Sequence, residues 1–445
     1  MFQRLRTQFP DAIKKVVPIN GDLVTEALGI NAQERALITR EVHVMFHMAA
    51  TLKLEGTLKD AIEMNTAGTE RVIDLCKEMK HLLALVHLST AFCNCDIDVM
   101  KEEVYDYKDD PHEVMRTVKW MDDQALIKAT NDIISPHVNT YTYSKRLAEI
   151  LIKEQFPNLP VSVTRPTIVC PAIEEPVAGW VDNLNGPVGL LVAAGKGVLR
   201  TMQCNTEYSA HIVPVDIAIN GLIAIGWETG LAYAKSKPKQ LPVYNMSQDG
   251  VVKANYGEVL NIGRSIIYDY PFEMCVWYPG GDFHKSTIVH WMYIIFLHFL
   301  PAYFIDFLMI LFRQKRFMVR LQWRILQGLD LLQFFTTRQW NFDCTNFYTL
   351  WDKLSIEDKR RFSMDFAAID IKTYLKICLL GARQYCMKED LSSLPRCRIK
   401  QKFLYVLDKV TIFGFFYLIL SLLGSIFEPI RYLLDCFKAG LSSIF

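Results

Sequence analysis

Apolar and polar positions alternate along the first 230 residues in a pattern that predicts strands separated by helices. Runs rich in apolar and β-branched residues predict five strands, at Lys15–Asn20, Val42–Ala49, Leu83–Leu88, Val161–Arg165 and His211–Val215. Between them, apolar residues recur with helical spacing over Thr57–Lys80 and Tyr141–Phe156. Apolar strands that alternate with helices indicate a parallel sheet covered on both faces, and such sheets bind ligands at the carboxyl ends of their strands.

The pattern changes near Gly230. Residues 231–265 contain scattered Gly, Pro, Lys and Asn and predict a linker with one more strand at Leu241–Tyr244. From about Tyr270 onward the pattern is helical, aromatic and basic. We therefore expect an α/β domain over residues 1–265, a mostly helical domain over 266–400 and an apolar tail over 401–445.

Two apolar tracts in the second half bear on membranes. Val410–Phe427 is a run of eighteen residues without a charge; as a helix it is about 27 Å long, for a bilayer core of about 30 Å. Thr287–Phe312 is longer, but Pro301 and Asp306 interrupt it, and a charge at membrane depth is costly. It predicts either a helical hairpin in a core or a segment that lies at a membrane surface. Five basic residues within Arg313–Arg324 favour the membrane surface.

Basic residues are distributed unequally around the tail tract. Four precede it, at Arg396, Arg398, Lys400 and Lys402, whereas only Arg431 and Lys438 follow it. This bias predicts that the part before the tail faces the cytosol.

Composition narrows the class of protein. The chain has 445 residues, 51% of them hydrophobic, and 49 basic against 48 acidic side chains leave a net charge of +1. This excludes a disordered, charge-dominated chain and gives no electrostatic reason to bind nucleic acid. Eleven cysteines without a CxxC pair predict reduced thiols and no metal site.

Tyr141 and Lys145 are the strongest candidates for chemistry. They are four residues apart at the start of a predicted helix, so they share one face. An ammonium one turn from a phenol favours the phenolate and brings the pKa of the tyrosine, ordinarily about 10, closer to neutral pH. This spacing alone is also common on exposed helices, so its context matters.

A second candidate feature lies about fifty residues earlier. The predicted strand Leu83–Leu88 ends in two hydroxyls, Ser89 and Thr90. Either is in isolation a common turn or helix-capping residue. At the carboxyl end of a buried parallel strand, however, a hydroxyl faces the ligand crevice and can bind a substrate carbonyl.

These residues, with several longer segments, resemble the extended short-chain dehydrogenase/reductases, and among them the alcohol-forming fatty acyl-CoA reductases. The segments that carry the resemblance are Val86–Asn94, Trp120–Asp123, Asn139–Glu149, Arg165–Val169, Glu175–Asn183, Asn185–Pro187, Gly195–Gly197, Val213–Asp216, Phe272–Glu273 and Trp340–Asn341. The resemblance covers nearly the whole chain. It implies a Rossmann-like domain followed by a mostly helical, membrane-associated domain, and NADPH-dependent reduction of a long-chain fatty acyl-CoA through an aldehyde to a primary alcohol.

The resemblance also implies roles for the candidate residues. Tyr141 would protonate the developing alkoxide, and Lys145 would lower the pKa of Tyr141 and hold the nicotinamide ribose. Thr90, or less favourably Ser89, would orient the carbonyl oxygen where negative charge develops.

Further cofactor contacts follow from the same resemblance. Asp22 and Leu23 look like the acidic strand end that meets the adenine, and Ala49 and Ala50 like the small-residue turn beside the pyrophosphate and ribose. Asn65 matches an asparagine of the next helix. Four residues would lie by the nicotinamide: Pro166, Thr167, Ile168 and Val169. Without the resemblance, an Ala-Ala strand end is equally well explained by close packing, and Asn65 by a local hydrogen bond.

The sequence departs from the family in one respect, because it contains no GxGxxG motif. In the family this loop receives the cofactor pyrophosphate at a helix N-terminus. Here the match begins at about Phe2–Arg6, which looks like a point inside the family's domain. We expect the first strand, its helix and the second strand to be missing, and NADPH binding to be weak.

This departure keeps other interpretations open. A relative without the loop would be a non-catalytic lipid-binding or membrane-scaffold protein. A sterol-type extended dehydrogenase is less favoured, because Glu175–Asn183 and the second domain have no evident use there. As a fatty acyl-CoA reductase the chain is expected on a peroxisomal or endoplasmic-reticulum membrane.

Overall fold

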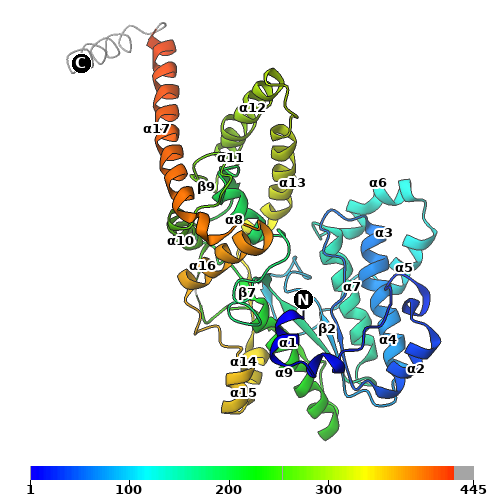
Figure 1. Cartoon of the computed structure of the whole chain (residues 1–445). Coiled ribbons are helices and arrows are strands. Elements are labelled where there is room, and N and C mark those ends of the chain that lie inside the picture. Colours follow the sequence, from blue (N-terminus) through cyan, green and yellow to red (C-terminus); the bar gives the residue numbers. More distant parts are fainter. Residues whose placement is uncertain (1, 253, 425–445) are drawn as a thin grey trace. The chain divides into compact units, whose positions relative to one another are not determined.

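The computed structural model describes residues 2–252 and 254–424, and these form two compact units (Figure 1). Unit 1 comprises Met1–Cys170, Ser209–Ala254 and Gln339–Ile369, and unit 2 comprises Pro171–Tyr208, Asn255–Arg338 and Asp370–Phe445. The compact units are therefore discontinuous in sequence, unlike the three consecutive segments expected above.

The centre of unit 1 is a parallel sheet of four strands in the order β1-β2-β4-β8. The strands are β1 (Val44–His47), β2 (Ala84–Leu88), β4 (Val161–Pro166) and β8 (Val243–Met246). In the register of the sheet, Leu85 of β2 lies between Met45 and Val161. This confirms the predicted parallel α/β fold class.

Helices cover both faces of this sheet. Successive side chains of a strand point to opposite faces, so Leu85 packs with Val72 and Leu151 of α4 and α7, whereas Val86 packs with Leu222 of α9 and Phe347 of α14. The helical elements of unit 1 are α1 (Gln3–Gln8), η1 (Ala12–Lys15), η2 (Glu26–Gly29), α2 (Ala32–Glu41), α3 (Leu58–Ala61), η3 (Ile62–Ala67), α4 (Gly68–Glu78), α5 (Pro111–Trp120), α6 (Asp123–Ile134), α7 (Thr140–Gln155), α9 (Val215–Lys235), α14 (Thr345–Lys353) and α15 (Ile356–Arg361).

Two short parallel pairs complete unit 1. They join β5 (Ile168–Cys170) to β7 (Ile212–Pro214), and β3 (Val99–Met100) to β10 (Asn341–Phe342). The strand expected over His211–Val215 is therefore present as β7, outside the main sheet.

The strand expected at Lys15–Asn20 is not formed. Residues 12–15 are a short 3₁₀ helix, and residues 16–20 are irregular and pair with no strand in the part of the chain described. A β-branched run adopts strand structure only where a neighbouring strand accepts its backbone hydrogen bonds. The apolar, β-branched residues Val16 and Val17 led to the prediction of a strand. The prediction was wrong because the described sheet contains no strand that pairs with this segment.

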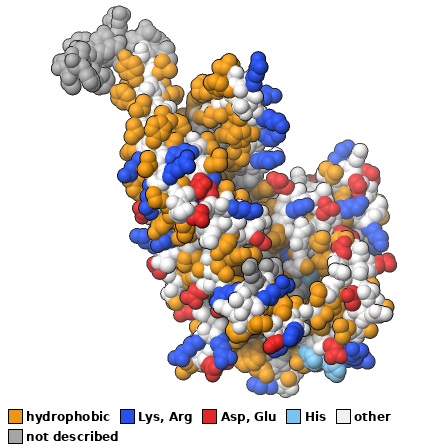
Figure 2. Space-filling view, in the orientation of Figure 1, with side chains coloured by type: hydrophobic (Ala, Val, Ile, Leu, Met, Phe, Trp, Pro, Cys, Tyr) orange, Lys and Arg blue, Asp and Glu red, His pale blue; other side chains and the backbone are white. Residues whose placement is uncertain are grey.

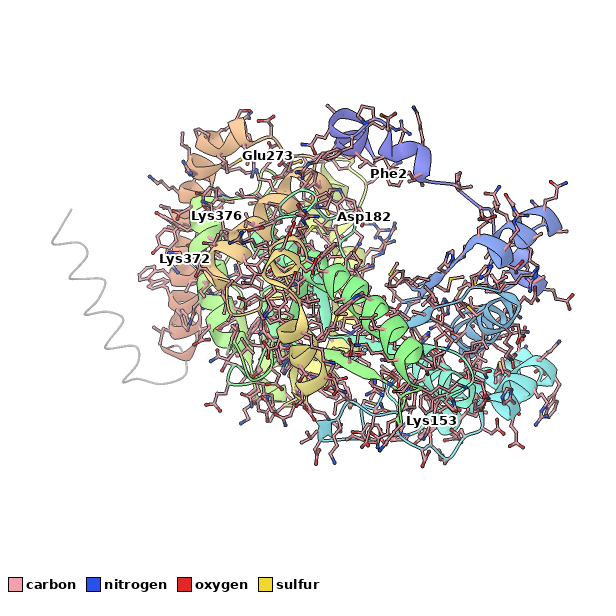
Figure 3. The ribbon with its side chains drawn as sticks, turned by 90° about the horizontal axis from the view of Figure 1, so that it is seen from below. Phe2, Lys153, Asp182, Glu273, Lys372 and Lys376 are labelled. Carbon is pink, nitrogen blue, oxygen red and sulfur yellow. The ribbon has the colours of Figure 1, made fainter. Side chains whose placement is uncertain are left out.

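Unit 2 is mostly helical. Its elements are α8 (Pro187–Gly195), β6 (Thr201–Gln203), α10 (Tyr256–Asp269), β9 (Asp282–His284), α11 (Thr287–Tyr293), η4 (Ile294–Phe299), α12 (Leu300–Leu311), α13 (Met318–Thr336), α16 (Ile371–Gly381), η5 (Ala382–Cys386), η6 (Leu391–Ser393) and α17 (Leu394–Gly424). Lys372 and Lys376 lie one turn apart on α16 (Figure 3), and Lys376 Nζ lies 4.9 Å from the centroid of the Tyr270 ring. This contact helps to join α16 to the end of α10.

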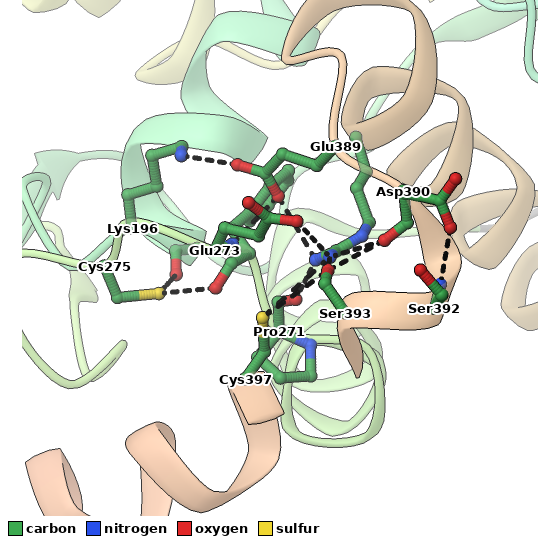
Figure 4. Close-up of polar contacts among 12 residues, drawn as sticks. Lys196, Pro271, Glu273, Cys275, Glu389, Asp390, Ser392, Ser393 and Cys397 are labelled. Atoms are coloured by element: carbon green, nitrogen blue, oxygen red, sulfur yellow. Dashed lines mark hydrogen bonds and ion pairs between the residues drawn. The ribbon is translucent and has the colours of Figure 1, made fainter. Parts of the chain in front are cut away.

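Arg383, fully buried in η5, holds the base of unit 2 together (Figure 4). Its guanidinium donates to the carbonyl oxygens of Pro271 and Asp390 and lies 3.2 Å from a carboxylate oxygen of Glu389. Glu389 in turn accepts from Lys196 Nζ at 2.8 Å. The end of α8, the segment after α10 and the start of α17 are thus linked through one buried cation.

Three described helices are long and apolar enough to cross a membrane, namely Val215–Lys235, Thr287–Leu311 and Leu391–Ser421. The first is α9, which packs on the sheet of unit 1. The third covers most of the predicted tail tract, whose last residues lie outside the described residues, as do Arg431 and Lys438. The second is one continuous helix of α11, η4 and α12, and it forms a hairpin with α13.

The charge within this second helix has a structural role. The Asp306 carboxylate is buried and accepts hydrogen bonds from the backbone N–H groups of Phe317, Met318 and Val319, at 3.1, 2.9 and 3.1 Å. These groups lie at the start of α13, where a helix has no internal acceptors for its N–H groups. Asp306 therefore caps α13 from the opposite arm of the hairpin.

We predict that Asp306→Ala lowers the free energy of unfolding by about 1–2 kcal/mol, because loss of a helix-capping carboxylate has that cost. Urea denaturation in detergent, followed by circular dichroism, measures the change. Asp330→Ala, an exposed acidic position on α13, is the matched control and should change the free energy by less than about 0.5 kcal/mol. Equal effects of the two substitutions would contradict the capping role.

Candidate functional site

The carboxyl ends of three neighbouring strands place most of the predicted site residues at one edge of the sheet. Ala49 and Ala50 follow β1, Ser89 and Thr90 follow β2, and Pro166 ends β4. The parallel pairing of these strands brings their carboxyl ends to the same edge. The position of Ser89 and Thr90 was expected from the end of their strand, whereas Ala49, Ala50 and Pro166 were expected at the cofactor from the family resemblance.

Helix α7 brings Tyr141 and Lys145 to this edge. Asn139 caps the helix by accepting from Thr142 N–H at 2.9 Å, which places Tyr141 in the first turn and Lys145 in the second. The helix is also held at Ser144, whose hydroxyl accepts from Asn65 Nδ2 at 2.9 Å.

The Thr90 side chain lies beside the Tyr141 phenol. Burial raises the pKa of Tyr141 to about 12, which outweighs the lowering by the Thr90 hydroxyl. A phenol with such a pKa keeps its proton at neutral pH. Tyr141 is thus a proton donor in this structure, and Thr90 is the hydroxyl in contact with it.

Lys145 does not contribute to the shift at Tyr141, contrary to the expectation that it lowers the pKa of the phenol. Its ammonium donates instead to the carbonyl oxygen of Leu88, at 2.7 Å. Burial lowers the pKa of Lys145 to about 8, although the nearby Glu149 carboxylate raises it. The ammonium is therefore bound to the end of β2 rather than directed at the phenol.

Glu149 and Arg165 form a fully buried ion pair behind Lys145. Two guanidinium nitrogens of Arg165 donate to the two carboxylate oxygens of Glu149, at 2.8 and 2.5 Å. The remaining donors of Arg165 reach the carbonyl oxygens of Lys101 and Glu103 at 3.0 and 2.9 Å. Although burial opposes it, Arg165 holds the pKa of Glu149 below its usual value. The Glu149 carboxylate is therefore ionised. It lies one helical turn after Lys145, as Lys145 lies one turn after Tyr141, so the three residues share one face of α7.

Two buried histidines border Lys145 on the sheet. The rings of His47 and His87, paired residues of β1 and β2, have centroids 5.3 Å apart. His47 Nε2 lies 3.0 Å from the Thr69 hydroxyl, which itself donates to a backbone carbonyl, so Nε2 carries the proton. Burial, followed by the charge of Lys145, lowers the pKa of His47 to about 3 and that of His87 well below its usual value. Both rings are neutral, and Lys145 is the cation of this cluster.

Asn65 has a larger role than a local hydrogen bond. It lies in the π-helical segment η3, accepts from Thr51 N–H at 2.8 Å and donates to the Thr51 carbonyl oxygen at 3.2 Å. It therefore ties the turn after β1, which contains Ala49 and Ala50, to Ser144 beside Lys145. Such π-helical turns are frequent at functional sites.

Asp22 and Leu23 are placed differently from the expectation. Because no strand forms at residues 15–20, Asp22 ends no strand; it is exposed and accepts from Val24 N–H at 3.1 Å in a turn. Leu23 packs against the position of Gly68 at the start of α4. Their assignment to the adenine stays a prediction.

Pro166, which ends β4, and the three residues after it lie in different environments. Thr167 is buried and donates to the carbonyl oxygen of Met246 at the end of β8, whereas Val169 is exposed in β5. Pro166 and Ile168 flank Thr167 at the end of the sheet. These positions do not test the assignment of the four residues to the nicotinamide, so it also stays a prediction.

The sequence analysis missed Glu149, Arg165 and His87 as parts of this site. A signal was present for Glu149, which follows Lys145 by four residues as Lys145 follows Tyr141. Nothing in the sequence pairs Glu149 with Arg165, because that pairing depends on α7 lying against β4.

Known families match this chain along most of its length. The sequence profile of an NAD-binding family described as "Male sterility protein" matches residues 1–222, and a second profile with the same description matches residues 297–389. Fatty acyl-CoA reductase 2 of Mus musculus is 31% identical over 398 residues, which are 89% of this chain and 76% of the relative. A putative fatty acyl-CoA reductase of Drosophila melanogaster is 32% identical over 418 residues, 94% of this chain and 81% of the relative.

Solved structures share the fold. The terminal R domain of the myxalamid biosynthetic pathway has a TM-score of 0.55 at 14% identity, and the match covers 85% of this chain and 78% of that one. The reductase domain of a nonribosomal peptide synthetase from Mycobacterium tuberculosis has a TM-score of 0.50 at 14% identity, with 85% and 80% covered.

The buried ion pair yields a test of the framework of the site. We predict that Glu149→Gln destabilises the protein by about 3–5 kcal/mol, because it leaves the Arg165 charge buried without its partner. Glu154→Gln is the matched control on the same helix: Glu154 pairs with His112 at the surface, and its loss should cost less than about 1 kcal/mol. Urea denaturation of both variants measures the difference, and an equal small effect would contradict a structural role for the buried pair.

Proposed function

This chain belongs to the fatty acyl-CoA reductase family, and on that premise we propose that it reduces a long-chain fatty acyl-CoA to a primary alcohol with NADPH. The reaction takes four electrons in two steps. In the first, a hydride adds to the thioester carbonyl carbon and the C–S bond breaks, so that CoA leaves as the thiolate and an aldehyde forms. In the second, a hydride adds to the aldehyde carbon and the resulting alkoxide is protonated. A bound NADPH supplies each hydride.

The observation that carries this proposal is the placement of the Thr90 hydroxyl beside the Tyr141 phenol, with the buried Lys145 at the same carboxyl edge of the sheet. The proposed role of Thr90 is to donate a hydrogen bond to the carbonyl oxygen, where negative charge develops. The proposed role of Tyr141 is to give its proton to the alkoxide, and its raised pKa keeps that proton available at neutral pH. Ser89 is the less favoured hydroxyl, because it lies beside Glu149 instead of Tyr141.

The residues at this edge suit a nicotinamide cofactor. Ala49 and Ala50 are small side chains after β1 and allow a ligand to approach the backbone closely. We propose that Lys145 holds the nicotinamide ribose, exchanging its bond to the Leu88 carbonyl for the ribose hydroxyls. Asn65 fixes the turn after β1 relative to Lys145. NADPH in preference to NADH rests on the family resemblance.

Glu149 and Arg165 are proposed as positioning residues. The Glu149 carboxylate favours the protonated form of Lys145 against the effect of burial. Arg165 keeps Glu149 ionised and joins it to the loop at Lys101 and Glu103. The neutral His47 and His87 leave Lys145 without a competing positive charge.

We further propose that the enzyme works on a peroxisomal or endoplasmic-reticulum membrane with unit 1 in the cytosol. The support lies in α17, where apolar side chains such as Val410, Phe413 and Phe416 are about 60% exposed. A helix with such a surface is stable in lipid rather than in water. The basic residues that precede this stretch support the cytosolic orientation.

Tyr141→Phe tests the acid role. We predict that it lowers alcohol formation from palmitoyl-CoA by about a hundred- to ten-thousand-fold and leaves the affinity for NADPH unchanged. Tyr143→Phe is the matched control: Tyr143 lies on another face of α7, where its hydroxyl bonds Asp109 at 3.0 Å, and its loss should leave turnover within a few-fold. Turnover by gas chromatography of the alcohol and NADPH titration by fluorescence are the measurements.

Two outcomes would contradict the proposal. Near-normal turnover by Tyr141→Phe would remove Tyr141 from the chemistry. A purified wild-type chain that binds acyl-CoA but neither binds NADPH nor forms alcohol would instead favour the non-catalytic lipid-binding relative.

The pH dependence tests Lys145. The pKa of this lysine is lowered to about 8, so it loses its proton as the pH rises through that value. We predict that kcat/KM falls about tenfold per pH unit above about pH 8, because the neutral amine holds the ribose less well. In Lys145→Arg the cation persists at all accessible pH values, so activity should be lower but flat between pH 7 and about pH 10. A wild-type profile that stays flat to about pH 10 would contradict the role.

A further inference from the structure

The hairpin of unit 2 has a fixed geometry. Its first arm is the continuous helix Thr287–Leu311, and its second arm is α13. The arms are joined by the Asp306 cap described above and by an edge-to-face contact of Phe299 and Trp323, with ring centroids 4.9 Å apart. Side chains buried on α13, Leu326 and Leu329, pack on the core of unit 2. These contacts join the two arms to each other and dock α13 on the core of unit 2.

The outer face of α12 is an apolar stripe. Its six side chains recur every three or four residues, so they lie on one side of the helix, opposite Ala302 and Asp306, which are buried. They are between 54% and 66% exposed: Leu300, Tyr303, Phe304, Phe307, Ile310 and Leu311. An exposed apolar surface of this kind marks an interaction site.

The end of the hairpin is strongly basic. Five cations follow the stripe, and we call them the basic tip: Arg313, Lys315, Arg316, Arg320 and Arg324. All five are exposed. None of them forms an ion pair among the residues described, although the charge of Arg316 acts on the nearby Asp306 carboxylate. Figure 2 shows the basic side chains together beside the hydrophobic surface of the hairpin. Phe312 and Phe317, exposed by 69% and 48%, lie among them.

Although Thr287–Leu311 is long enough to cross a bilayer, the hairpin is not built to do so. If the first arm crossed, α13 would have to return through the same bilayer. The outer side of α13 is polar and exposed, with Arg320, Arg324, Gln327 and Asp330, and several such residues at membrane depth are prohibitive together. An apolar stripe with flanking cations is instead typical of a helix that lies in the interface of one leaflet.

We propose that the α12–α13 hairpin is a monotopic membrane-binding element, whose apolar stripe enters one leaflet while the basic tip binds anionic phospholipid headgroups. The partner is a lipid surface because the site combines a water-exposed aromatic stripe with unpaired cations, which matches the acyl and headgroup layers of an anionic leaflet. The site is distinct from α17 and does not depend on the proposed reductase chemistry.

A second observation places the hairpin with the tail helix. Arg200 donates its backbone N–H to His298 of the hairpin at 2.9 Å, and its guanidinium lies 3.4 Å from Asp408 of α17. Trp277 Nε1 also donates to Asp408, at 2.6 Å. Both apolar helices are thus held by one residue and project from the same end of unit 2 (Figure 1). The same membrane can therefore contact both α17 and the hairpin.

The test compares binding of the full-length protein to vesicles of phosphatidylcholine, with and without about one third phosphatidylserine. The tip variant is Arg313→Gln with Lys315→Gln and Arg316→Gln. Each basic residue near an anionic surface contributes about a fivefold change, so the variant should lose on the order of a hundredfold in partition to phosphatidylserine vesicles. Its partition to neutral vesicles, which α17 supports, should change little. Flotation measures both.

The matched control removes the same charge elsewhere. Lys235, Lys237 and Lys239 are three exposed cations of unit 1, and their joint change to Gln should leave the preference for phosphatidylserine intact. A second measurement follows the acetylation of single lysines by mass spectrometry. Phosphatidylserine vesicles should slow the acetylation of Lys315 but not that of Lys237. Equal losses in the two triple variants would overturn the basic tip as a specific site.

The apolar stripe is tested separately by Phe304→Ser with Phe307→Ser, exposed positions at which the fold needs no apolar side chain. This variant should retain the circular dichroism of the wild type and bind phosphatidylserine vesicles at least tenfold less well. If it instead converts a dimer to a monomer in sedimentation and binds vesicles normally, the stripe is covered by a second copy of the chain and the proposal is wrong.

Discussion

The buried ion pair of Glu149 and Arg165 is the constraint on which the geometry of unit 1 depends. Buried charges need a partner and hydrogen bonds. Arg165 donates two hydrogen bonds to Glu149 and two more to the carbonyl oxygens of Lys101 and Glu103. The pair joins α7 to β4 and so sets where Tyr141 and Lys145 lie relative to the strand ends. Asn65 and Thr66 hold the same helix from its other side, through Ser144. The position of two reactive side chains is thus decided by residues that do not react.

The local electrostatics follow from this framework. Burial has opposite effects on the two groups, because it disfavours the charged form of each: it raises the pKa of Tyr141 and lowers that of Lys145. The Glu149 carboxylate partly offsets the effect at Lys145. The site therefore contains a neutral phenol and a cation at neutral pH, which is the combination that protonation of an alkoxide and binding of a ribose require.

Unit 2 uses buried charge in a different way. Arg383 gathers three segments at its base, Arg200 holds α17 and the hairpin, and Asp306 caps α13 from across the hairpin. In each case a charged side chain in an apolar context satisfies backbone groups or another charge. In the sequence Asp306 is an interruption of an apolar tract, whereas in the structure its carboxylate caps the second arm of the hairpin. This arrangement leaves the apolar side of α12 free for a surface outside the protein.

Local sequence patterns were sufficient for the parallel α/β class, four of the strands in the main sheet, the helix that carries Tyr141 and Lys145, and the hydroxyls after β2. Each of these depends on residues close in the chain, whose periodicity and spacing are visible without a structure. The strand at residues 15–20 could not be predicted in this way, because strand formation depends on a partner distant in sequence. For the same reason the pairing of Glu149 with Arg165, the orientation of Lys145 toward Leu88 and the cap of α13 by Asp306 were decided only by tertiary structure: each joins segments that come together when helices pack on the sheet or on one another.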